Sequence, residues 1–337
     1  MKILYLSCHA VLEYDECKLL TELGHEVYSH GVYRDPRGAY TLPRPGVPGM
    51  KVDENWIELT GKNPKTALTK EMIDPFDAII IMSGENEGPL VSNWQNIKHK
   101  RVIWRSIGQS TESTERAITR CKAEGLQVIR YSPKERNIPG FAGEDALIRF
   151  YKDPLDYQGW NGLDNRPINF TQTLKGRGKM VHYDQIMGSL VGFDNAKVYG
   201  PGNNDLGSFN GGEVTYYAML QLLRDSRVFV YGGTWPASYT LSFIEAMMTG
   251  TPIVALSKIG AQVDGVEPFY YYEVADIIHS AGLSCANDAQ DMRIFINSYL
   301  DDLVVAQTNS IKLRERALQL FSKEVIAPQW ADFLSKG

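Results

Sequence analysis

The chain of 337 residues lacks most of the short motifs that mark common enzyme classes. No G-x-G-x-x-G run follows the first apolar segment, which argues against a nicotinamide or flavin dinucleotide fold. No G-x-S-x-G supports a hydrolase, and no G-x-x-x-x-G-K-[ST] supports an ATPase. No Asp-x-Asp triplet and no His/Cys cluster with ligand spacing occurs, so we expect no metal site.

Cysteines are few and long apolar runs are missing. The four cysteines are scattered without metal-like pairing, at Cys8, Cys17, Cys121 and Cys285. We expect reduced thiols and a cytoplasmic location. No run approaches the ~18 apolar residues of a membrane span. The apolar segment at 3–6 is too short for a secretory signal.

Charge and length give broader limits. The formal net charge of −5 provides no general attraction to nucleic acid or anionic membranes. The length suggests two domains, because a single core rarely grows beyond ~250–300 residues.

Apolar strands and helical segments alternate in the first half of the chain. The pattern predicts strands at 2–7, 25–30, 76–82, 101–107 and 126–131. Helices are expected at 13–23, 52–60, 69–74 and 111–125. This order predicts an α/β domain with a doubly wound parallel sheet at residues 1–152.

A second alternating series follows an aperiodic connection at 153–167, which we interpret as an interdomain linker. Strands are expected at 168–172, 197–199, 227–231, 253–256 and 283–285. Helices are expected at 182–190, 213–225, 241–248, 272–281, 289–302 and 309–320. The chain is therefore predicted to form two Rossmann-like domains facing across a cleft, the second at 168–320.

The segment 227–256 organises the second domain. It reads as strand, loop, helix, tight turn and strand, and the run Gly250-Thr251-Pro252 ends its helix. In such a unit the helix N-terminus faces the carboxyl end of the sheet, where its free N–H groups favour an anion.

This segment resembles the signature of the retaining glycosyltransferases of family 4, the "glycosyl transferases group 1" domain. The resemblance rests on Ile244-Glu245-Ala246-Met247 and on the run 250–255, GTPIVA. It implies the GT-B architecture. It also implies that the last segment, 321–337, crosses back to the first domain as a helix.

The resemblance assigns the donor site to the signature helix. The amides around Tyr239, Thr240 and Leu241 are expected to bind the diphosphate of a nucleotide sugar, and Glu245 its ribose hydroxyls. A carboxylate accepts two hydroxyl hydrogen bonds well. We expect Glu245→Ala to weaken donor binding more than it disturbs the fold.

The family also places cations after the first strand of the second domain, where they neutralise the diphosphate. Lys175, Arg177 and Lys179 all qualify as catalytic residues of this kind, and spacing does not choose among them. Gly200 and Tyr231 complete the expected donor side.

One departure from the family pattern is clear. The carboxylate that contacts the donor sugar stands eight residues before the ribose Glu, and this chain has Ala237 there. Either Ser238, Tyr239 and backbone amides recognise the sugar, or the sugar differs, or activity is altered.

The first domain is expected to supply the acceptor side through loops at its strand ends. His9 and Arg105 are catalytic candidates. The acceptor-side candidates are Ser7, Glu13, Asp15 and Gln109. As alternatives, His9 is a plain loop histidine, and Glu13 and Asp15 cap the following helix.

The function expected from the resemblance is sugar transfer from a nucleotide-sugar donor to an acceptor hydroxyl, with retained configuration and without metal or cofactor. Two alternatives stay open. One is a phage-type DNA-base glycosyltransferase acting on hydroxymethylated bases, in which nucleic acid enters only as acceptor. The other is a non-catalytic module that binds sugar nucleotides.

Overall fold

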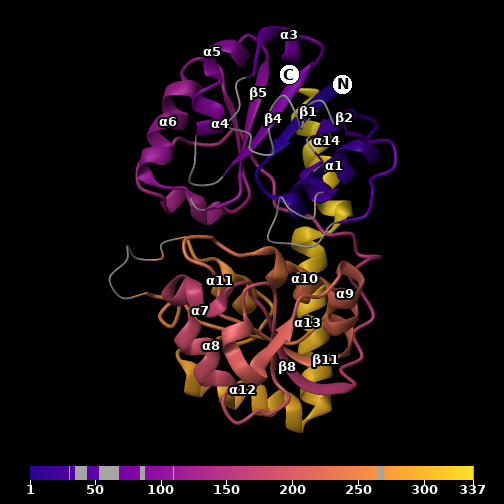
Figure 1. Cartoon of the computed structure of the whole chain (residues 1–337), viewed down its shortest axis with the longest axis vertical. Helices are drawn as coiled ribbons and strands as arrows, with labels where there is room; N and C mark the ends of the chain where they lie inside the picture. Colours follow the sequence, from indigo (N-terminus) through magenta and orange to yellow (C-terminus); the bar gives the residue numbers. More distant parts are fainter. Residues whose placement is uncertain are drawn as a thin grey trace. The chain divides into compact units, whose positions relative to one another are not determined.

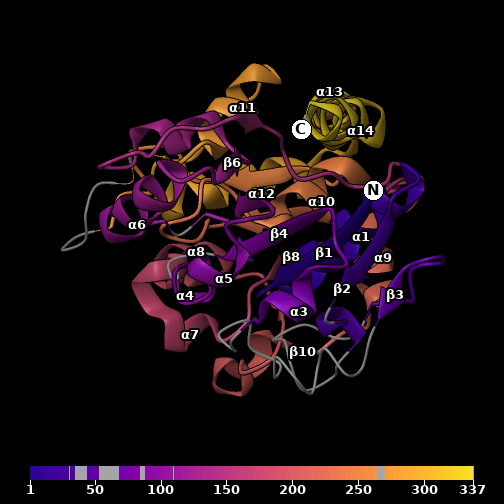
Figure 2. The same cartoon turned by 90° about the horizontal axis from the view of Figure 1, so that it is seen from above.

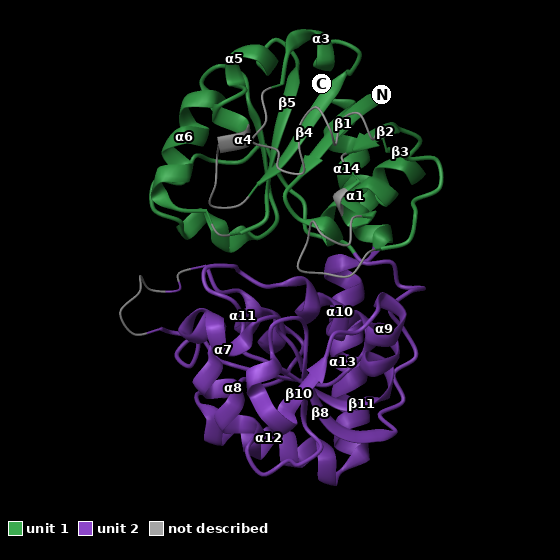
Figure 3. Cartoon of the chain, viewed as in Figure 1, with its two compact units in different colours: residues 1–151, 323–337 green, residues 152–322 purple. Residues whose placement is uncertain are grey.

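The computed structural model divides the chain into two compact units (Figure 1, Figure 3). Unit 1 comprises residues 1–151 and 323–337, and unit 2 comprises residues 152–322. The structure describes residues 1–29, 31–34, 44–52, 68–83, 88–108, 110–263, 269 and 271–336. No helix in these ranges is long and apolar enough to cross a membrane.

Unit 1 is built on a parallel sheet with the strand order β3-β2-β1-β4-β5-β6-β7. Its strands are β1 (Lys2–Ser7), β2 (Glu26–Ser29), β3 (Lys51–Val52), β4 (Ala78–Ser83), β5 (Arg101–Ser106), β6 (Gln127–Arg130) and β7 (Ala146–Leu147). Figure 2 shows β4, β1 and β2 side by side in the sheet. Every residue of β4 is buried, as expected of a parallel strand covered on both faces. The five strands predicted for this half are confirmed, and β3 and β7 extend the sheet at its two edges.

Helices and helical turns cover the sheet of unit 1. They are α1 (Ala10–Glu22), η1 (Val32–Arg34), α3 (Lys70–Ile73), α4 (Gly88–Val91), α5 (Trp94–Ile97), α6 (Glu112–Lys122), η2 (Pro133–Asn137) and α14 (Lys323–Ser335). The last of these belongs to unit 1 although it follows unit 2 in the sequence. Arg101 of β5 holds the last turn of α14 by donating hydrogen bonds to the carbonyls of Phe333 and Leu334, at 2.9 and 2.7 Å.

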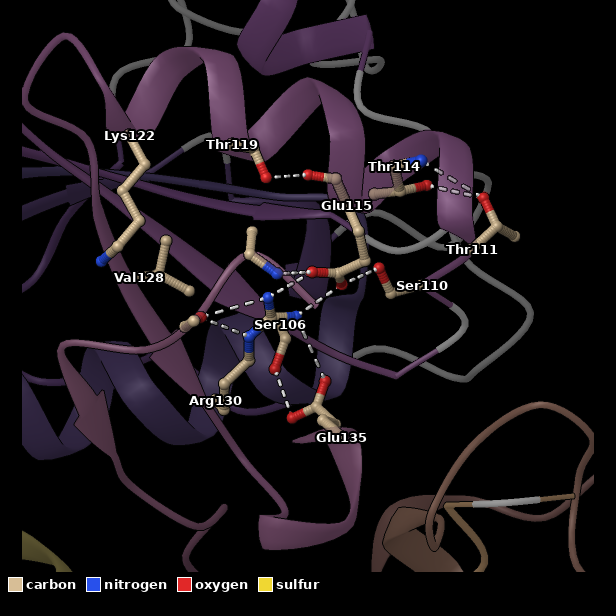
Figure 4. Close-up of polar contacts among 12 residues, drawn as sticks. Ser106, Ser110, Thr111, Thr114, Glu115, Thr119, Lys122, Val128, Arg130 and Glu135 are labelled. Atoms are coloured by element: carbon tan, nitrogen blue, oxygen red, sulfur yellow. Dashed lines mark hydrogen bonds and ion pairs between the residues drawn. The ribbon is translucent and has the colours of Figure 1, made fainter. Parts of the chain in front are cut away.

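A charged network lies inside unit 1 near the carboxyl ends of β5 and β6 (Figure 4). Arg130 and Glu115 are both fully buried and form a two-pronged ion pair, with N–O distances of 2.8 and 2.6 Å. Ser110 donates to the same carboxylate at 2.5 Å. The network thus joins α6 to the strand and loop beside it.

The network continues to a second acid. Glu135 accepts a hydrogen bond from the Ser106 hydroxyl at 2.9 Å and from the Tyr131 amide at 2.9 Å. Burial raises the pKa of Glu135, and the nearby charge of Arg130 opposes that rise. The loop after β6 is therefore held against the end of β5 by polar contacts that water does not reach.

We predict that Arg130→Met lowers the free energy of unfolding by about 3–5 kcal/mol, because Glu115 then keeps a buried charge without its cation. The matched control is Arg116→Met, which removes an arginine from α6, the helix that carries Glu115. Arg116 pairs with Glu112 at 2.6 Å, but both side chains are more than half exposed, at 64% and 58%. That variant should change stability by less than ~1 kcal/mol. Urea denaturation followed by circular dichroism measures both, and equal effects would contradict the prediction.

Unit 2 contains a second parallel sheet, with the strand order β10-β9-β8-β11-β12. Its strands are β8 (Asp164–Phe170), β9 (Lys197–Tyr199), β10 (Asn210–Gly212), β11 (Ser226–Tyr231) and β12 (Ile253–Ala255). The helices and turns around it are α7 (Leu174–Arg177), η3 (Gly178–Val181), α8 (Tyr183–Leu190), η4 (Asn204–Phe209), α9 (Tyr216–Asp225), α10 (Leu241–Thr249), α11 (Val274–Ser280), α12 (Ala289–Asp301) and α13 (Leu303–Phe321).

The signature segment folds as the sequence predicts. β11, α10 and β12 form the strand–helix–strand unit, and β11 pairs in parallel with β12. Gly250 ends α10 with φ 88°, and its N–H donates to the carbonyls of Ala246 and Met247. This left-handed conformation suits glycine because a side chain there would be strained.

Three sequence predictions for unit 2 are wrong in detail. No strand forms at 283–285; the chain makes a single bridge from Leu256 to Ala286 instead. Helix α13 begins at Leu303, six residues before the predicted start, because the Asp302 side chain caps it there. The predicted linker is packed structure: β8 already begins at Asp164, and the Trp160 indole donates to the Ser226 carbonyl at 2.8 Å.

The helix predicted at 52–60 falls almost wholly outside the described residues, and Val52 itself belongs to β3.

Candidate functional site

The loops after β8 and β9 are joined at the carboxyl end of the sheet in unit 2. Asn203, only 1% exposed, donates to the Thr171 carbonyl at 2.7 Å and accepts from the Leu174 amide at 2.8 Å. The Thr173 amide donates to the Pro201 carbonyl at 2.8 Å. These contacts fix the loop that carries the candidate cations.

Gly200 is required by this close packing. Its φ is 132°, and a Cβ atom there would lie 3.1 Å from the backbone nitrogen of Gln172. A side chain would therefore push the two loops apart. The predicted contact of Gly200 with a donor stays a prediction.

The N-terminus of α10 lies at the carboxyl end of β11 and has no side-chain cap. Thr240 occupies the cap position, but its side chain does not accept from the helix amides. Its hydroxyl lies 3.1 Å from the hydroxyls of Tyr231 and Ser242 instead. The same residue type does cap α9, where Thr215 accepts from the Ala218 amide at 3.2 Å. The first amides of α10 therefore lack the acceptor that a cap residue normally provides.

Tyr231 contacts the residue before α10, and the charge of Arg177 acts on Tyr231. The Tyr231 hydroxyl accepts a hydrogen bond from the Thr240 amide at 3.0 Å. Burial raises the pKa of Tyr231 to about 12, while the positive charge of Arg177 acts in the opposite direction. Arg177 is half-buried, and desolvation lowers its pKa. Among the described residues it has no hydrogen bond or ion pair, so its charge is not neutralised there.

The two lysines differ from Arg177. Lys175 is 54% exposed and lies 4.0 Å from Asp205. Lys179 is also exposed. Of the three candidate cations, Arg177 is the one whose charge acts on Tyr231 beside α10. The catalytic role proposed for the three residues stays a prediction.

Glu245 has partners that the sequence did not indicate. Its carboxylate accepts from the Lys152 ammonium at 2.7 Å and from the Tyr157 hydroxyl at 3.0 Å. The side chains of Lys152 and Glu245 are 0% and 5% exposed. Glu245 thus ties the middle of α10 to the first residues of unit 2. Its role in binding ribose stays a prediction.

This ion pair revises the effect expected for Glu245→Ala. Removing the carboxylate leaves the Lys152 ammonium buried without it, so we predict a loss of about 3–5 kcal/mol in the free energy of unfolding. The double variant Lys152→Met/Glu245→Met removes both charges and should recover most of that loss. Thermal and urea unfolding of both variants test this, and a Glu245→Ala protein as stable as the wild type would show the pair to be dispensable.

The remaining donor-side candidates lie in or next to the loop before α10. Ser238 is buried, and its carbonyl accepts from the Glu273 amide at 3.0 Å. Tyr239 is also buried, with its ring 5.5 Å from that of Phe321. Leu241 is the first residue of α10. Their contacts to a ligand stay predictions.

In unit 1, Ser7 and His9 lie together at the carboxyl end of β1. The Ser7 hydroxyl accepts from the His9 amide at 3.0 Å. The His9 ring in turn accepts from the Leu12 amide at 3.5 Å and so caps α1. The alternative of a histidine that shapes the loop therefore has a geometric basis, and its catalytic role stays a prediction.

Glu13 and Asp15 lie in α1. Glu13 is fully buried and accepts from the amides of Gly31 and Tyr33, at 3.1 and 3.0 Å. It thus anchors the turn after β2, rather than capping its own helix. Asp15 is 8% exposed. Gln109 lies outside the described residues.

Arg105 is completely buried in unit 1. It donates to Glu16 at 2.9 and 2.7 Å, and Glu16 also accepts from the Tyr5 hydroxyl at 2.6 Å. Its guanidinium lies over the rings of Phe150 and Trp330, at 4.8 and 5.7 Å. The geometry gives Arg105 a packing role between β5, α1 and α14, and a catalytic role for it stays a prediction.

Four residues of unit 2 near this site have contacts that no sequence pattern indicates. Asn203 stands next to a Gly-Pro-Gly run that marks a loop but does not reveal a bridging amide. Lys152 and Tyr157 belong to an aperiodic segment with no signal for burial. The sequence pattern predicts His182 only as the start of a helix.

Compared by sequence, the chain matches no protein-family model and no curated protein. Among solved structures it is similar over its whole length to Alr3699/HepE of Anabaena in complex with UDP and glucose. That match has a TM-score of 0.71, 15% identity and 100% coverage of both chains. It is also similar to AviGT4, a glycosyltransferase involved in avilamycin A biosynthesis, with a TM-score of 0.62, 16% identity and coverage of 100% and 97%.

A third similar structure is an alpha-glucosyltransferase in complex with UDP-glucose and DNA containing an abasic site. The TM-score is 0.64 at 10% identity, and 99% of both chains is covered. The chain has the GT-B fold. This confirms the fold class predicted from the signature, with its two parallel sheets.

Proposed function

We propose that the protein is a glycosyltransferase that takes its sugar from a UDP-sugar and passes it to an acceptor hydroxyl. One observation supports this most strongly. The charge of Arg177 acts on Tyr231 at the end of β11, and the Tyr231 hydroxyl contacts Thr240 at the uncapped N-terminus of α10. This combination of a cation, a hydroxyl and free amides suits a diphosphate.

The same groups favour bond cleavage as well as binding. When the sugar–phosphate bond breaks, negative charge grows on the diphosphate that leaves. Fixed N–H dipoles and the Arg177 guanidinium stabilise that growing charge without having to reorganise. Burial keeps the Tyr231 hydroxyl protonated, and it can donate a further hydrogen bond when Thr240 is the donor of the contact between their hydroxyls.

The choice of a uridine nucleotide is supported by similar structures. HepE was solved with UDP, with UDP-glucose, and with UDP and glucose, and the DNA-bound alpha-glucosyltransferase with UDP-glucose. All cover at least 99% of this chain. We therefore propose a UDP-linked hexose as the donor.

The acceptor is open to two readings. A glycan, lipid-linked or small-molecule hydroxyl is favoured, because the formal net charge of −5 gives no general attraction to a polyanion. A DNA base is the second candidate, since one full-length similar structure holds DNA. A non-catalytic module would bind UDP-sugars without cleaving the sugar–phosphate bond, so no UDP would form.

We predict that UDP and UDP-glucose raise the unfolding temperature, as expected when a ligand binds only the folded state. Arg177→Met should weaken UDP binding by about ten-fold or more, the usual loss for a hydrogen bond from a charged group. Lys175→Met is the matched control, because Lys175 is exposed and lies near Asp205. It should change affinity by less than about three-fold.

Isothermal titration calorimetry gives both dissociation constants. Failure of the wild type to bind any nucleotide sugar in a thermal-shift panel would exclude the proposed donor class. Equal losses in the two variants would remove the specific role of Arg177.

We predict a retained anomeric configuration and activity that persists in EDTA. Both follow from the resemblance to the family 4 enzymes, and the second also from the lack of Asp-x-Asp. Proton NMR of the freshly formed product, or of the sugar released by donor hydrolysis, reports the anomer. An inverted product, or activity that EDTA abolishes and Mg²⁺ or Mn²⁺ restores, would overturn this mechanism.

A further inference from the structure

His182 is a buried histidine at the carboxyl end of the sheet in unit 2. It is 5% exposed and immediately precedes α8. Its Nε2 atom lies 2.9 Å from the carbonyl oxygen of Ala261. The ring therefore reaches from the loop after β8 to the loop after β12, across the end of β11, which lies between those strands.

Gly233 connects His182 to the candidate diphosphate site. A Cβ atom built on Gly233 would lie 4.0 Å from Cε1 of His182 and 3.9 Å from Cε1 of Tyr231. Both rings therefore flank the same glycine just after β11. Tyr231 is the residue whose hydroxyl accepts from the Thr240 amide at the start of α10.

The contact with Ala261 decides the chemistry of the ring. A carbonyl oxygen only accepts, so Nε2 of His182 carries the hydrogen. Burial lowers the pKa of His182, with the Ala261 carbonyl acting in the opposite direction, and the lowered pKa favours the neutral ring at neutral pH. In a neutral imidazole with hydrogen on Nε2, Nδ1 is an acceptor.

No hydrogen-bond donor faces this acceptor in the part of the chain that the structure describes. Nδ1 of His182 is buried and has no hydrogen-bond partner there. The residue is also held at φ 56°, in the left-handed region. An unmatched buried acceptor and a left-handed backbone are each unfavourable, and such features gather at functional sites.

We propose that Nδ1 of His182 accepts a hydrogen bond from a hydroxyl group of the donor, and so helps to select it. This rests on the proposed function. Both phosphates of a UDP-sugar are esterified and fully ionised at neutral pH, so their oxygens carry no hydrogen and would face the Nδ1 lone pair unfavourably. The ribose and the sugar of a UDP-sugar both present hydroxyls, which match an acceptor.

The inference also bears on Ala237. The family signature places an acidic acceptor at that position, and this chain has none there. His182 supplies a neutral acceptor from a different loop at the same end of the sheet. Hydroxyl recognition is then possible without a second carboxylate close to the diphosphate.

The test compares His182→Gln with His182→Asn. Glutamine can still donate to the Ala261 carbonyl but has no polar atom at the place of Nδ1. Asparagine places its amide near Nδ1, tolerates the left-handed conformation and loses the contact with Ala261. Binding of UDP-glucose, UDP and 2′,3′-dideoxy-UDP is measured by calorimetry, alongside urea unfolding of each protein.

We expect His182→Gln to weaken UDP-glucose binding about three- to ten-fold, the usual effect of one hydrogen bond, and His182→Asn to weaken it less. If the sugar supplies the hydroxyl, UDP affinity is unchanged. If the ribose supplies it, UDP affinity falls as well, while dideoxy-UDP affinity is unchanged. Both patterns support the proposal and distinguish the two sources.

Three results would overturn the proposal. One is wild-type affinity of His182→Gln for UDP-glucose, and another is an equal loss for all three ligands. The third is uptake of about one proton on UDP binding, measured in two buffers of different ionisation enthalpy and absent in the variant, because Nδ1 would then face phosphate. A wild type that binds none of the three ligands would defeat the proposed function itself.

Discussion

The helix α10 is fixed along most of its length but left open at its first turn, and the candidate site depends on this contrast. Phe243, Ile244 and Met247 are fully buried in the core of unit 2, and Gly250 closes the far end. The ion pair from Glu245 to Lys152 adds a polar anchor in the middle of the helix. With these contacts in place, the first turn does not need a side-chain cap. Its amides can therefore face a ligand without loss of helix position.

Much of the fold could be predicted from the sequence because parallel strands covered on both faces give continuous apolar runs. β4 and β11 are examples, and both were predicted within two residues of their observed limits. β3 and β7 escaped because two paired residues leave no periodic pattern. The cap at Asp302 moved the start of α13 against the apolar pattern, which shows that a local hydrogen bond outweighs periodicity at a helix end.

The site was less predictable because its chemistry depends on pairing across long sequence separations. Spacing could not choose among Lys175, Arg177 and Lys179, and only the fold brings one of them beside Tyr231. The same limit applies to Arg105 and Glu13. Both were expected in loops at strand ends, yet Arg105 lies within β5 and Glu13 within α1, and each is buried and matched inside unit 1. A charged residue near a strand end is therefore ambiguous until its partner is known.

Arg177 of unit 2 differs in its partners from the buried arginines of unit 1. In unit 1 the buried arginines are matched by acids on α1 and α6, as Arg105 is by Glu16 and Arg130 by Glu115. Such pairs join helices to strands inside unit 1. In unit 2 the half-buried Arg177 has no acidic partner among the described residues, and its neighbour Tyr231 is a neutral hydroxyl. An unmatched cation in a partly desolvated position attracts an anion far more strongly than an exposed one, because water screens it less. The diphosphate proposed as the ligand of unit 2 would therefore meet the charge of Arg177 without competition from an acidic partner among the described residues.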